Sequence, residues 1–370
     1  MFREVELQGL IPATLQWFQK NKRDLPWRHT NNPYHIWVSE IMLQQTRVEA
    51  VIPYYERFLH RLPTIRDLAM CPEDELLKLW EGLGYYSRVR NLQKAAQRMV
   101  ESYDGQMPPT YEEILTMPGI GAYTAGAIAS RVYEEVVPAV DGNVLRILTR
   151  LTEDDSDIAK EKTKKAAIAW LSDEMRAGIC GAEAGEFNQA LMELGATVCV
   201  PNGAAHCDVC PWQQACGAYQ NHTIERYPVK AKAKARRIEE KTVLLIMDDD
   251  KIFIRKRPAR GLLAGLYEFP GVEGRISKKQ CISYVRTLGM EPLYVEALPE
   301  AKHIFSHIEW HMTGYLVKLD HTADVQLPEG ILVAIEEVQN TYPIPAAFEK
   351  YAACIQLGVG AAEVRKQMDL

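Results

Sequence analysis

The spacing of apolar residues changes once along the chain, and no other feature constrains the fold as strongly. From Leu10 to about Ala218, apolar residues recur at helical spacing and are broken into short segments by prolines. Beyond that point they alternate with polar residues, and segments 242–247 and 251–256 flank an aspartate-rich turn as in a β-hairpin. We therefore predict an all-α region followed by a smaller α+β domain.

Other segments support this division. Residues 230–241, KAKAKARRIEEK, alternate alanine with basic residues and predict a linker, which we place at 223–240 between domains at 1–222 and 241–365. In the second domain Ser277 is suited to cap an amphipathic helix, whose apolar face would hold Cys281, Ile282, Val285 and Leu288. A half-buried strand is predicted by the alternation with polar residues of Ile308, Trp310 and Met312.

The charge of the chain is uneven. Its formal net charge is -6, which as an average argues against a nucleic-acid partner. Residues 82–98, however, contain no acid and place four cations along one predicted helix: Arg88, Arg90, Lys94 and Arg98. Beside the pair Tyr85-Tyr86, this basic stripe suits contact with phosphates and stacking on bases, although a solvated helix face is the alternative.

The start of the sequence has no charged and then apolar leader, and no apolar run reaches the roughly 18 residues of a membrane span. We expect a soluble, cytoplasmic protein, in which the eight cysteines are reduced thiols. Four of them lie close together in CVPNGAAHCDVCPWQQAC (199–216), which indicates a metal centre with zinc or an iron–sulfur cluster: Cys199, Cys207, Cys210 and Cys216.

The stretch MPGIGAYTAG (117–126) places a tight turn directly before a helix. Gly119 and Gly121 would let a phosphate approach the backbone amides that the turn and the helix N-terminus leave exposed. With the helix expected before it, the segment 111–132 predicts a helix-hairpin-helix, a module that grips DNA phosphates without reading bases. A turn whose glycines serve only close packing is the alternative.

Two carboxylic acids have contrasting surroundings. Glu40 lies in IWVSEIMLQQT (36–46), a predicted helix whose apolar neighbours should raise the pKa of Glu40, unless it occupies a solvent-exposed face. Asp141 precedes a helix that begins near Val144 and should cap it as an anion. A neutral acid and an anion together suit the cleavage of a glycosidic bond, and an enzyme that acts on a base in duplex DNA must also flip that base out.

The hairpin, the VDGN sequence at Asp141 and the cysteine loop together resemble the endonuclease III superfamily of DNA glycosylases. Over nearly the whole chain the sequence is similar to the adenine DNA glycosylases of the MutY type, through LPWR (25–28), SEIMLQQTRV (39–48), WEGLGYYSRVRNL (80–92), AVDGNVLR (139–146) and FNQALMELGA (187–196). The resemblance implies that the four clustered cysteines hold a [4Fe–4S] cluster. The first cysteine gap has seven residues where the family usually has six, and the turn-forming pair Asn202-Gly203 is suited to absorb the extra one.

The resemblance also implies roles for single residues. Glu40 would protonate the adenine ring. Asp141 would stabilise or covalently trap the sugar cation, and Tyr123 and Asn143 would support that step. The adenine pocket would contain Arg28, Leu43 and Gln189. DNA contacts would come from Gln45, Thr46, Tyr85, Arg88, Gly119 and Gly121, of which Gln45 and Tyr85 would wedge into the duplex. Because Tyr123 stands where bifunctional relatives carry a Schiff-base lysine, we expect base removal without strand cleavage.

The C-terminal domain resembles a Nudix fold. Hydrolysis by that fold needs a helix with several glutamates that hold magnesium, but residues 274–290 contain neither Asp nor Glu. We therefore expect this domain to bind a ligand without hydrolysing it. The sequence Phe305-Ser306-His307 matches the loop with which the family senses 8-oxoguanine.

These expectations combine into one hypothesis. The chain would be a monofunctional glycosylase that flips out adenine mispaired with 8-oxoguanine or guanine in double-stranded DNA. It would hydrolyse the N-glycosidic bond of that adenine through an oxocarbenium-like intermediate. We expect a monomer that is associated with the nucleoid and has no membrane partner. One alternative is a relative with another target, such as thymine in T·G mismatches. Another is a non-catalytic DNA-binding iron–sulfur protein. A nucleotide hydrolase is opposed by the missing glutamates.

Overall fold

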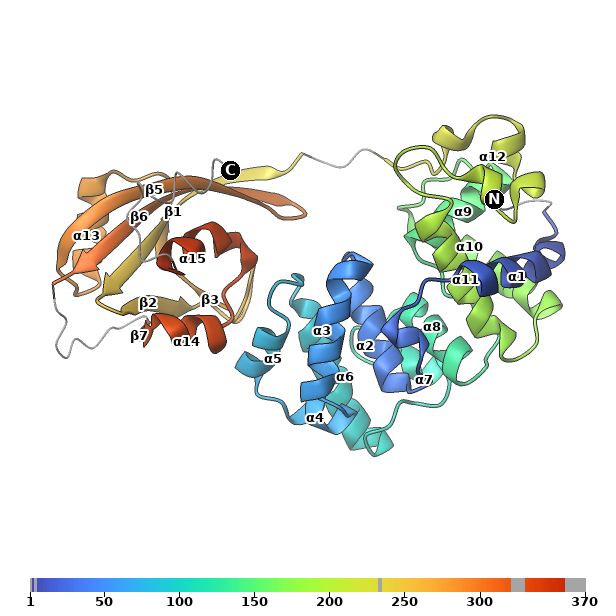
Figure 1. The fold of residues 1–370 in the computed structure, drawn as a ribbon, viewed down its shortest axis with the longest axis horizontal. Coiled ribbons are helices and arrows are strands. Elements are labelled where there is room, and N and C mark those ends of the chain that lie inside the picture. Colours follow the sequence, from blue (N-terminus) through green and yellow to red (C-terminus); the bar gives the residue numbers. More distant parts are fainter. Residues whose placement is uncertain (1, 3–4, 232–234, 321–329, 357–370) are drawn as a thin grey trace. The chain divides into compact units, whose positions relative to one another are not determined.

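The computed structural model describes residues 2, 5–231, 235–320 and 330–356, and these form two compact units (Figure 1). The first unit holds the described residues of 1–70 and 87–231, and the second holds those of 71–86 and 235–356. A helical region followed by a sheet-containing domain is the predicted fold class, which is confirmed. The centre of the predicted linker (232–234) and the end of the predicted second domain (357–365) lie outside the described residues.

The first unit is built of helices. They are α1 (Ile11–Asn21), α2 (Pro33–Leu43), α3 (Val48–Arg61), α4 (Ile65–Met70), α6 (Ser87–Tyr103), α7 (Tyr111–Leu115), α8 (Ala122–Val132), α9 (Gly142–Thr152), α10 (Glu161–Gly178), α11 (Glu183–Thr197) and α12 (Gly217–Gln220). Short 3₁₀ turns lie between them, including η2 (Pro26–Arg28) and η3 (Cys207–Val209). This run of short helices follows the proline breaks that the sequence predicts.

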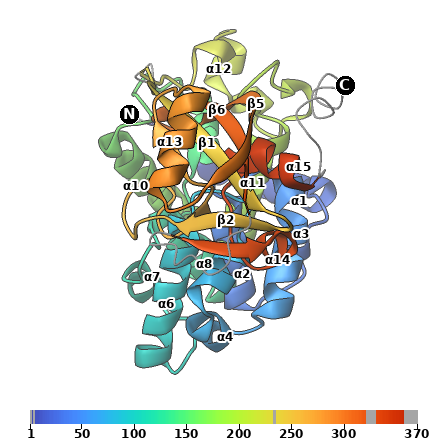
Figure 2. The same cartoon turned by 90° about the vertical axis from the view of Figure 1, so that its left-hand side faces the viewer.

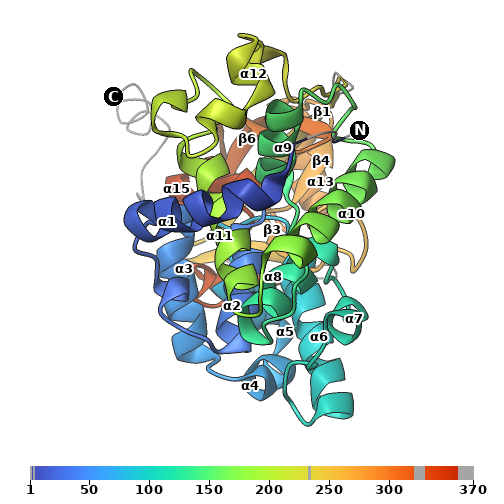
Figure 3. The same ribbon diagram turned by 90° about the vertical axis from the view of Figure 1, so that its right-hand side faces the viewer.

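Helices α9, α10 and α11 share one apolar core (Figure 3). Leu148 of α9, Leu171 of α10 and Leu191 of α11 are fully buried in it, and α1 packs across α11. Helix α8 packs against both α2 and α11. At Gly126 of α8 a Cβ would overlap the backbone carbonyl oxygen of Pro138, so glycine is required for the segment before α9 to pass this closely. The close pass fixes where α9 begins.

The second unit is built on a seven-stranded sheet. Its strands run in the order β3-β2-β1-β6-β5, with β4 paired to β1 and β7 paired to β2. The elements are α5 (Glu73–Leu79), β1 (Arg237–Asp248), β2 (Lys251–Lys256), β3 (Tyr267–Glu268), β4 (Gly271–Glu273), α13 (Lys278–Thr287), β5 (Pro292–Ile304), β6 (Ile308–Leu319), β7 (Ile331–Ala334), α14 (Ile335–Asn340) and α15 (Glu349–Gln356).

Both faces of this sheet are covered, because alternate residues of β1 enter different cores (Figure 2). Leu244 packs with Cys281 and Val285 of α13, as the predicted amphipathic helix requires. Leu245 packs with Trp310 on the other face, in the core that also holds residues of α14 and α15. The sequence alone predicts a hairpin and a half-buried strand here, and the sheet buries them on both sides.

The predicted hairpin and helix cap of this unit are confirmed. Strands β1 and β2 pair antiparallel, and Ser277 forms a capping box with Gln280 at the start of α13. One difference concerns the linker, because β1 begins at Arg237 and the end of the predicted linker therefore belongs to the sheet. The reason is the long parallel pairing of β1 with β6, which runs from Arg237 opposite Ile308 to Met247 opposite Lys318.

Segment 71–86 belongs to the second unit although it lies between two helices of the first in sequence. Lys78 donates hydrogen bonds to the carbonyl oxygens of Val338 and Tyr342, at 3.4 and 3.1 Å. Glu81 accepts one from the backbone N–H of Ile344 at 2.6 Å. These contacts join residues more than 250 positions apart, so no local pattern in the sequence could predict them.

Candidate active site

Helix α2 carries Glu40 into the interior of the first unit. Asn32 caps this helix by accepting a hydrogen bond from the backbone N–H of Tyr34 at 2.9 Å. Every residue from 36 to 42 is buried, and Glu40 is only 8% exposed. The alternative of a solvent-exposed carboxylate is therefore wrong.

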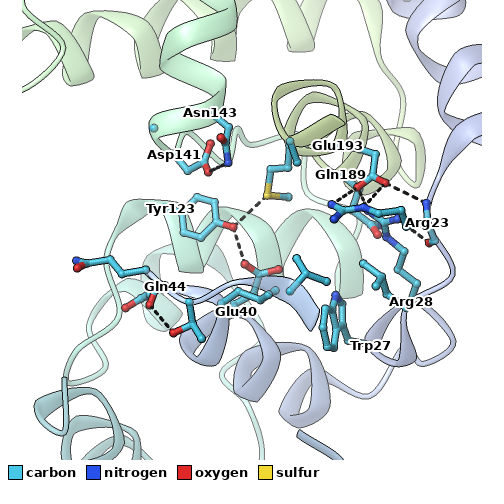
Figure 4. Close-up of a pocket in the computed structure, with 18 of the residues that line it drawn as sticks. Arg23, Trp27, Arg28, Glu40, Gln44, Tyr123, Asp141, Asn143, Gln189 and Glu193 are labelled. Atoms are coloured by element: carbon cyan, nitrogen blue, oxygen red, sulfur yellow. Dashed lines mark hydrogen bonds and ion pairs between the residues drawn. The ribbon is translucent and has the colours of Figure 1, made fainter. Parts of the chain in front are cut away.

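The carboxyl group of Glu40 is in contact with Tyr123. The Tyr123 hydroxyl donates a hydrogen bond to Oε2 of Glu40 at 2.6 Å and lies 3.0 Å from Sδ of Met192 (Figure 4). Burial raises the pKa of Glu40, while the hydrogen bond from Tyr123 and the positive charge of Arg131 oppose the rise. The predicted rise is confirmed. Burial also raises the pKa of Tyr123, and the charges of Glu40 and Asp141 raise it further, so its phenol stays protonated.

The helix-hairpin-helix predicted at 111–132 is formed by α7, the turn and α8. Gly119 has φ +75°, and a Cβ there would lie 2.5 Å from the Cβ of Asn91, so only glycine fits. Gly121 is the N-cap of α8, and a Cβ there would meet nothing within 4 Å. Space therefore remains for a phosphate at the start of α8, and Tyr123 projects from the first turn of the same helix.

Asp141 caps α9, as predicted. Its Oδ1 accepts a hydrogen bond from the backbone N–H of Val144, and its Oδ2 accepts one from Nδ2 of Asn143, both at 2.8 Å. Burial raises the pKa of Asp141, and the hydrogen bonds from Val144 and Asn143 oppose that rise without cancelling it. The carboxyl group of Asp141 lines the cavity described below.

Asn143 is itself held in place. Its Oδ1 accepts a hydrogen bond from Arg146 at 2.9 Å, and Arg146 also donates to the carbonyl oxygen of Gly195 at 2.6 Å. A Cβ at Gly195 would lie 2.6 Å from the Cβ of Asn143, so α11 can approach the start of α9 only through a glycine. Asn143 is thereby positioned against Asp141.

One cavity of about 500 Å³ joins these groups (Figure 4). Every predicted catalytic and adenine-pocket residue lines it: Glu40, Asp141, Tyr123, Asn143, Arg28, Leu43 and Gln189. Two residues predicted to touch DNA, Gln45 and Thr46, line it as well. The volume is within the range of small-molecule sites, and the carboxyl groups of Glu40 and Asp141 both line it.

Other residues that line the cavity were not predicted from the sequence. Glu193 is 1% exposed and forms ion pairs with Arg23 and Arg28, both at 2.8 Å. Arg131 donates hydrogen bonds to the carbonyl oxygens of Trp27 and Thr30, both at 2.7 Å. One available signal was that Glu193 lies one helical turn after Gln189, on the same face of α11. Nothing local indicated Arg131.

The predicted wedge residues have an unusual backbone. Gln45 and Tyr85 have φ angles of 58° and 47°, a region that residues other than glycine rarely adopt. Such strain is often found at functional positions. Tyr85 is 49% exposed, whereas Tyr86 is buried, so the predicted pair of stacking tyrosines is wrong for Tyr86.

The predicted basic stripe divides into two groups. Arg88 donates to the carbonyl oxygens of Ile41, Met42 and Gln44 at distances of 2.6–3.1 Å, so its guanidinium satisfies the end of α2. On α6, Lys94 and Arg98 are exposed and Arg90 is half-buried. Contact of these cations with phosphates stays a prediction.

The four clustered cysteines meet in the loop that follows α11. The loop packs against the core of α9, α10 and α11. Burial, together with the nearby Cys199, Cys207 and Cys216, raises the pKa of Cys210 to about 12. Arg150 donates a hydrogen bond to Sγ of Cys199 at 3.2 Å. Among the described residues, no three His, Cys, Asp or Glu side chains are arranged to hold a single metal ion.

The long first gap of this loop closes as the sequence suggests. Gly203 has φ +78°, and residues 201–204 are exposed. The chain then returns to the helix end, where the backbone N–H of His206 donates to the carbonyl oxygen of Val198 at 3.0 Å. The longer gap is therefore taken up by an exposed turn at residues 201–204.

The predicted 8-oxoguanine loop is the turn between β5 and β6. Ser306 and His307 are exposed at its tip, where Ser306 Oγ lies 3.1 Å from Nδ1 of His307. Phe305 is half-buried and packs edge-on against Trp310, with ring centroids 4.9 Å apart. Phe305 thus anchors a turn that presents two polar side chains.

Comparisons with known proteins agree with this geometry. Residues 38–172 match the model of the HhH-GPD superfamily base excision DNA repair protein, and residues 242–353 match that of the NUDIX domain. The structure also resembles that of a thermostable thymine-DNA glycosylase, with a TM-score of 0.51 and 25% identity, covering 58% of this chain and 97% of the other. The fold and site thus define a base excision repair protein of the helix-hairpin-helix class.

Similarity to curated proteins shows which family within this class the chain belongs to. The chain is 36% identical to an adenine DNA glycosylase of Mus musculus, covering 85% of this chain and 72% of that protein. It is 35% identical to an adenine DNA glycosylase of Buchnera aphidicola subsp. Baizongia pistaciae, covering 80% of this chain and 82% of that protein. The chain belongs to the adenine DNA glycosylase family.

Proposed function

We propose that the protein hydrolyses the N-glycosidic bond of adenine in double-stranded DNA where adenine is mispaired with 8-oxoguanine or guanine. The observation that carries this proposal is that Glu40 and Asp141, from helices α2 and α9, line one cavity that fits a nucleoside. Burial raises the pKa of Glu40, which suits a proton donor, while the hydrogen bonds that Asp141 accepts from Val144 and Asn143 favour its anionic form against the effect of burial. The family to which the chain belongs supports adenine as the base.

The reaction uses the two carboxyl groups in sequence. Glu40 gives its proton to a ring nitrogen of the flipped adenine, and the bonding electrons of the glycosidic bond leave with the base. Asp141 stabilises the positive charge that develops on the sugar, and Asn143 holds Asp141 in place. A water molecule then adds to the anomeric carbon and returns a proton to Glu40.

Tyr123 makes the enzyme monofunctional. A phenol cannot form the Schiff base that a lysine would form at this position, so the strand is left intact with an abasic site. Its hydroxyl is also committed to Glu40, which keeps the carboxyl group oriented toward the base. When Glu40 is protonated, the same hydroxyl can turn its proton to Sδ of Met192.

The second unit recognises the base opposite adenine. Helix α13 contains no acidic residue, so it cannot hold the magnesium of a Nudix hydrolase. Ser306 and His307 are exposed side chains that can hydrogen-bond groups present on 8-oxoguanine and absent from guanine. Phe305 supports them from the core.

The four cysteines hold a [4Fe–4S] cluster. Four thiols on one short loop match the ligand set of such a cluster. Bound there, such a cluster would cross-link the loop that packs against the core of α9, α10 and α11, while the protein's own carboxyl groups perform the reaction.

The protein works as a monomer on nucleoid DNA. Exposed cations of α6 and the open N-terminus of α8 supply phosphate contacts, while Gln45 and Tyr85 enter the duplex. Across the described ranges, no helix has the length and apolar character needed to cross a bilayer.

The test uses duplexes with one A·8-oxoguanine, A·G or T·G pair. The wild type should release free adenine from the first two and leave the strand intact until alkali is added. Glu40→Gln should bind the duplex and release nothing, while Glu101→Gln, an exposed position on α6, should act like the wild type. Release of thymine in place of adenine, or cleavage without alkali, would contradict the proposal.

A further inference from the structure

Arg28 is held rigidly at the wall of the cavity. Its side chain is 13% exposed and follows the short turn η2. One terminal nitrogen donates to Glu193 and the other to the carbonyl oxygen of Arg23, both at 2.8 Å. The guanidinium also lies 5.2 Å from the ring centroid of Phe18. A guanidinium has five N–H donors, so others can point to a base in the cavity.

The carboxylate of Glu193 has no acceptor position left with which to bind a base directly. Its Oε1 accepts hydrogen bonds from the backbone N–H and Nε of Arg23, at 3.0 and 2.8 Å. Its Oε2 accepts from Nη2 of Arg23 and Nη2 of Arg28, at 2.9 and 2.8 Å. Two carboxylate oxygens offer about four acceptor positions, and all are used. Burial alone would raise the pKa of Glu193, but the hydrogen bonds from Arg23 and Arg28 lower it to about 2, so it is an anion at neutral pH.

We propose that Glu193 is a positioning residue that acts through Arg28 and sets how tightly the flipped adenine is held. The proposal rests on the proposed function, because it needs a base in the cavity. Adenine presents ring nitrogens as acceptors, and Arg28 can donate to one only if its guanidinium is fixed in direction. Without the anion at position 193, two neighbouring arginines would repel each other and Arg28 would lose this direction.

The test compares two uncleaved ligands. One duplex carries 2′-fluoro-2′-deoxyadenosine opposite 8-oxoguanine, since the fluorine destabilises the sugar cation and blocks release of the base. The other carries a tetrahydrofuran abasic site, which puts no base in the cavity. Glu193→Gln should weaken binding of the first by about 10- to 100-fold and leave binding of the second within about twofold. Glu186→Gln, an exposed position on the same helix, should bind both like the wild type.

A double-mutant cycle separates positioning from general structure. In an Arg28→Leu background, Glu193→Gln should cause no further loss of binding, because its effect passes through Arg28. Equal weakening of both duplexes, unchanged binding of both, or a full additional loss in the Arg28→Leu background would overturn the proposal. If Glu193→Gln does not fold, Glu193→Asp takes its place, with the same pattern expected from a shorter side chain.

The outcome is separable from that of the proposed function. Wild-type release of adenine from an ordinary A·8-oxoguanine duplex tests the function. If the wild type releases adenine and Glu193→Gln binds the two uncleaved duplexes normally, only the role of Glu193 fails. If the wild type releases none, the function fails, whatever the variant binds.

Discussion

Replacing Tyr123 by Phe removes the hydrogen bond that the phenol donates to Glu40 at 2.6 Å. This bond stabilises the carboxylate and so opposes the rise that burial causes in the pKa of Glu40. Without it the pKa of Glu40 rises further. In the proposed mechanism Glu40 is the proton donor, so activity should be present below its pKa and fall as the pH rises through it. The alkaline limb of the rate profile should therefore move to higher pH in Tyr123→Phe.

The size of the displacement follows from the strength of the bond. A hydrogen bond to a charged group contributes about 1.5–3 kcal/mol, which corresponds to a displacement of about 1–2 pH units. The assay is single-turnover release of adenine across pH, since product release then does not limit the rate. The maximum rate should fall as well, because one oxygen of a buried carboxyl group loses its partner.

Tyr133→Phe is a matched control. Its hydroxyl donates to the carbonyl oxygen of Met107 at 3.1 Å, away from Glu40, so its profile should coincide with that of the wild type. An alkaline limb that stays in place in Tyr123→Phe, or moves to lower pH, would refute the role of Glu40 as the acid that Tyr123 tunes.

Three further outcomes are expected. The pKa of Glu193 is lowered from 4.5 to about 2, so its ion pairs contribute about 3 kcal/mol to the free energy of unfolding above pH 4.5. This contribution is lost as the pH falls through 2. Urea unfolding should show the loss in the wild type and not in Glu193→Gln. Cys210→Ser should lose iron and labile sulfide, whereas Cys180→Ser, an exposed thiol outside the loop, should keep both; equal iron content would refute the cluster site. Ser306→Ala should lower the ratio of the rates for A·8-oxoguanine and A·G about tenfold, and Ser283→Ala on α13 should leave that ratio unchanged; an unaltered ratio in Ser306→Ala would refute the role of the loop.

Several features of the site could be predicted because they are local. Asp141 before a helix indicates an N-cap, and the structure forms that cap. Glu40 among apolar neighbours indicates a buried acid, and it is buried. The glycine turn before Tyr123 indicates a hairpin, and Gly119 has the conformation that requires glycine. In each case the residue and its cause lie within one or two helical turns.

Other features depended on contacts between distant segments. Tyr85 and Tyr86 are adjacent in sequence, yet only packing decides that Tyr86 is buried and Tyr85 is not. Arg88 lies in a basic stripe, but the end of α2 captures its guanidinium. The pKa of Asp141 is raised because the start of α9 faces a cavity and not solvent.

The sequence by itself determined which elements form, because the period of apolar residues and the capping residues act over a few positions. It also determined the chemical groups available, including two carboxyl groups, a phenol in place of a lysine and four clustered thiols. Only the tertiary structure decided that Glu40 and Tyr123, 83 positions apart, share a hydrogen bond, and that Arg28 donates one to Glu193 from 165 positions away. The physical reason is that hydrogen bonds and ion pairs act over a few ångströms, and close packing of distant helices alone brings such groups within that range.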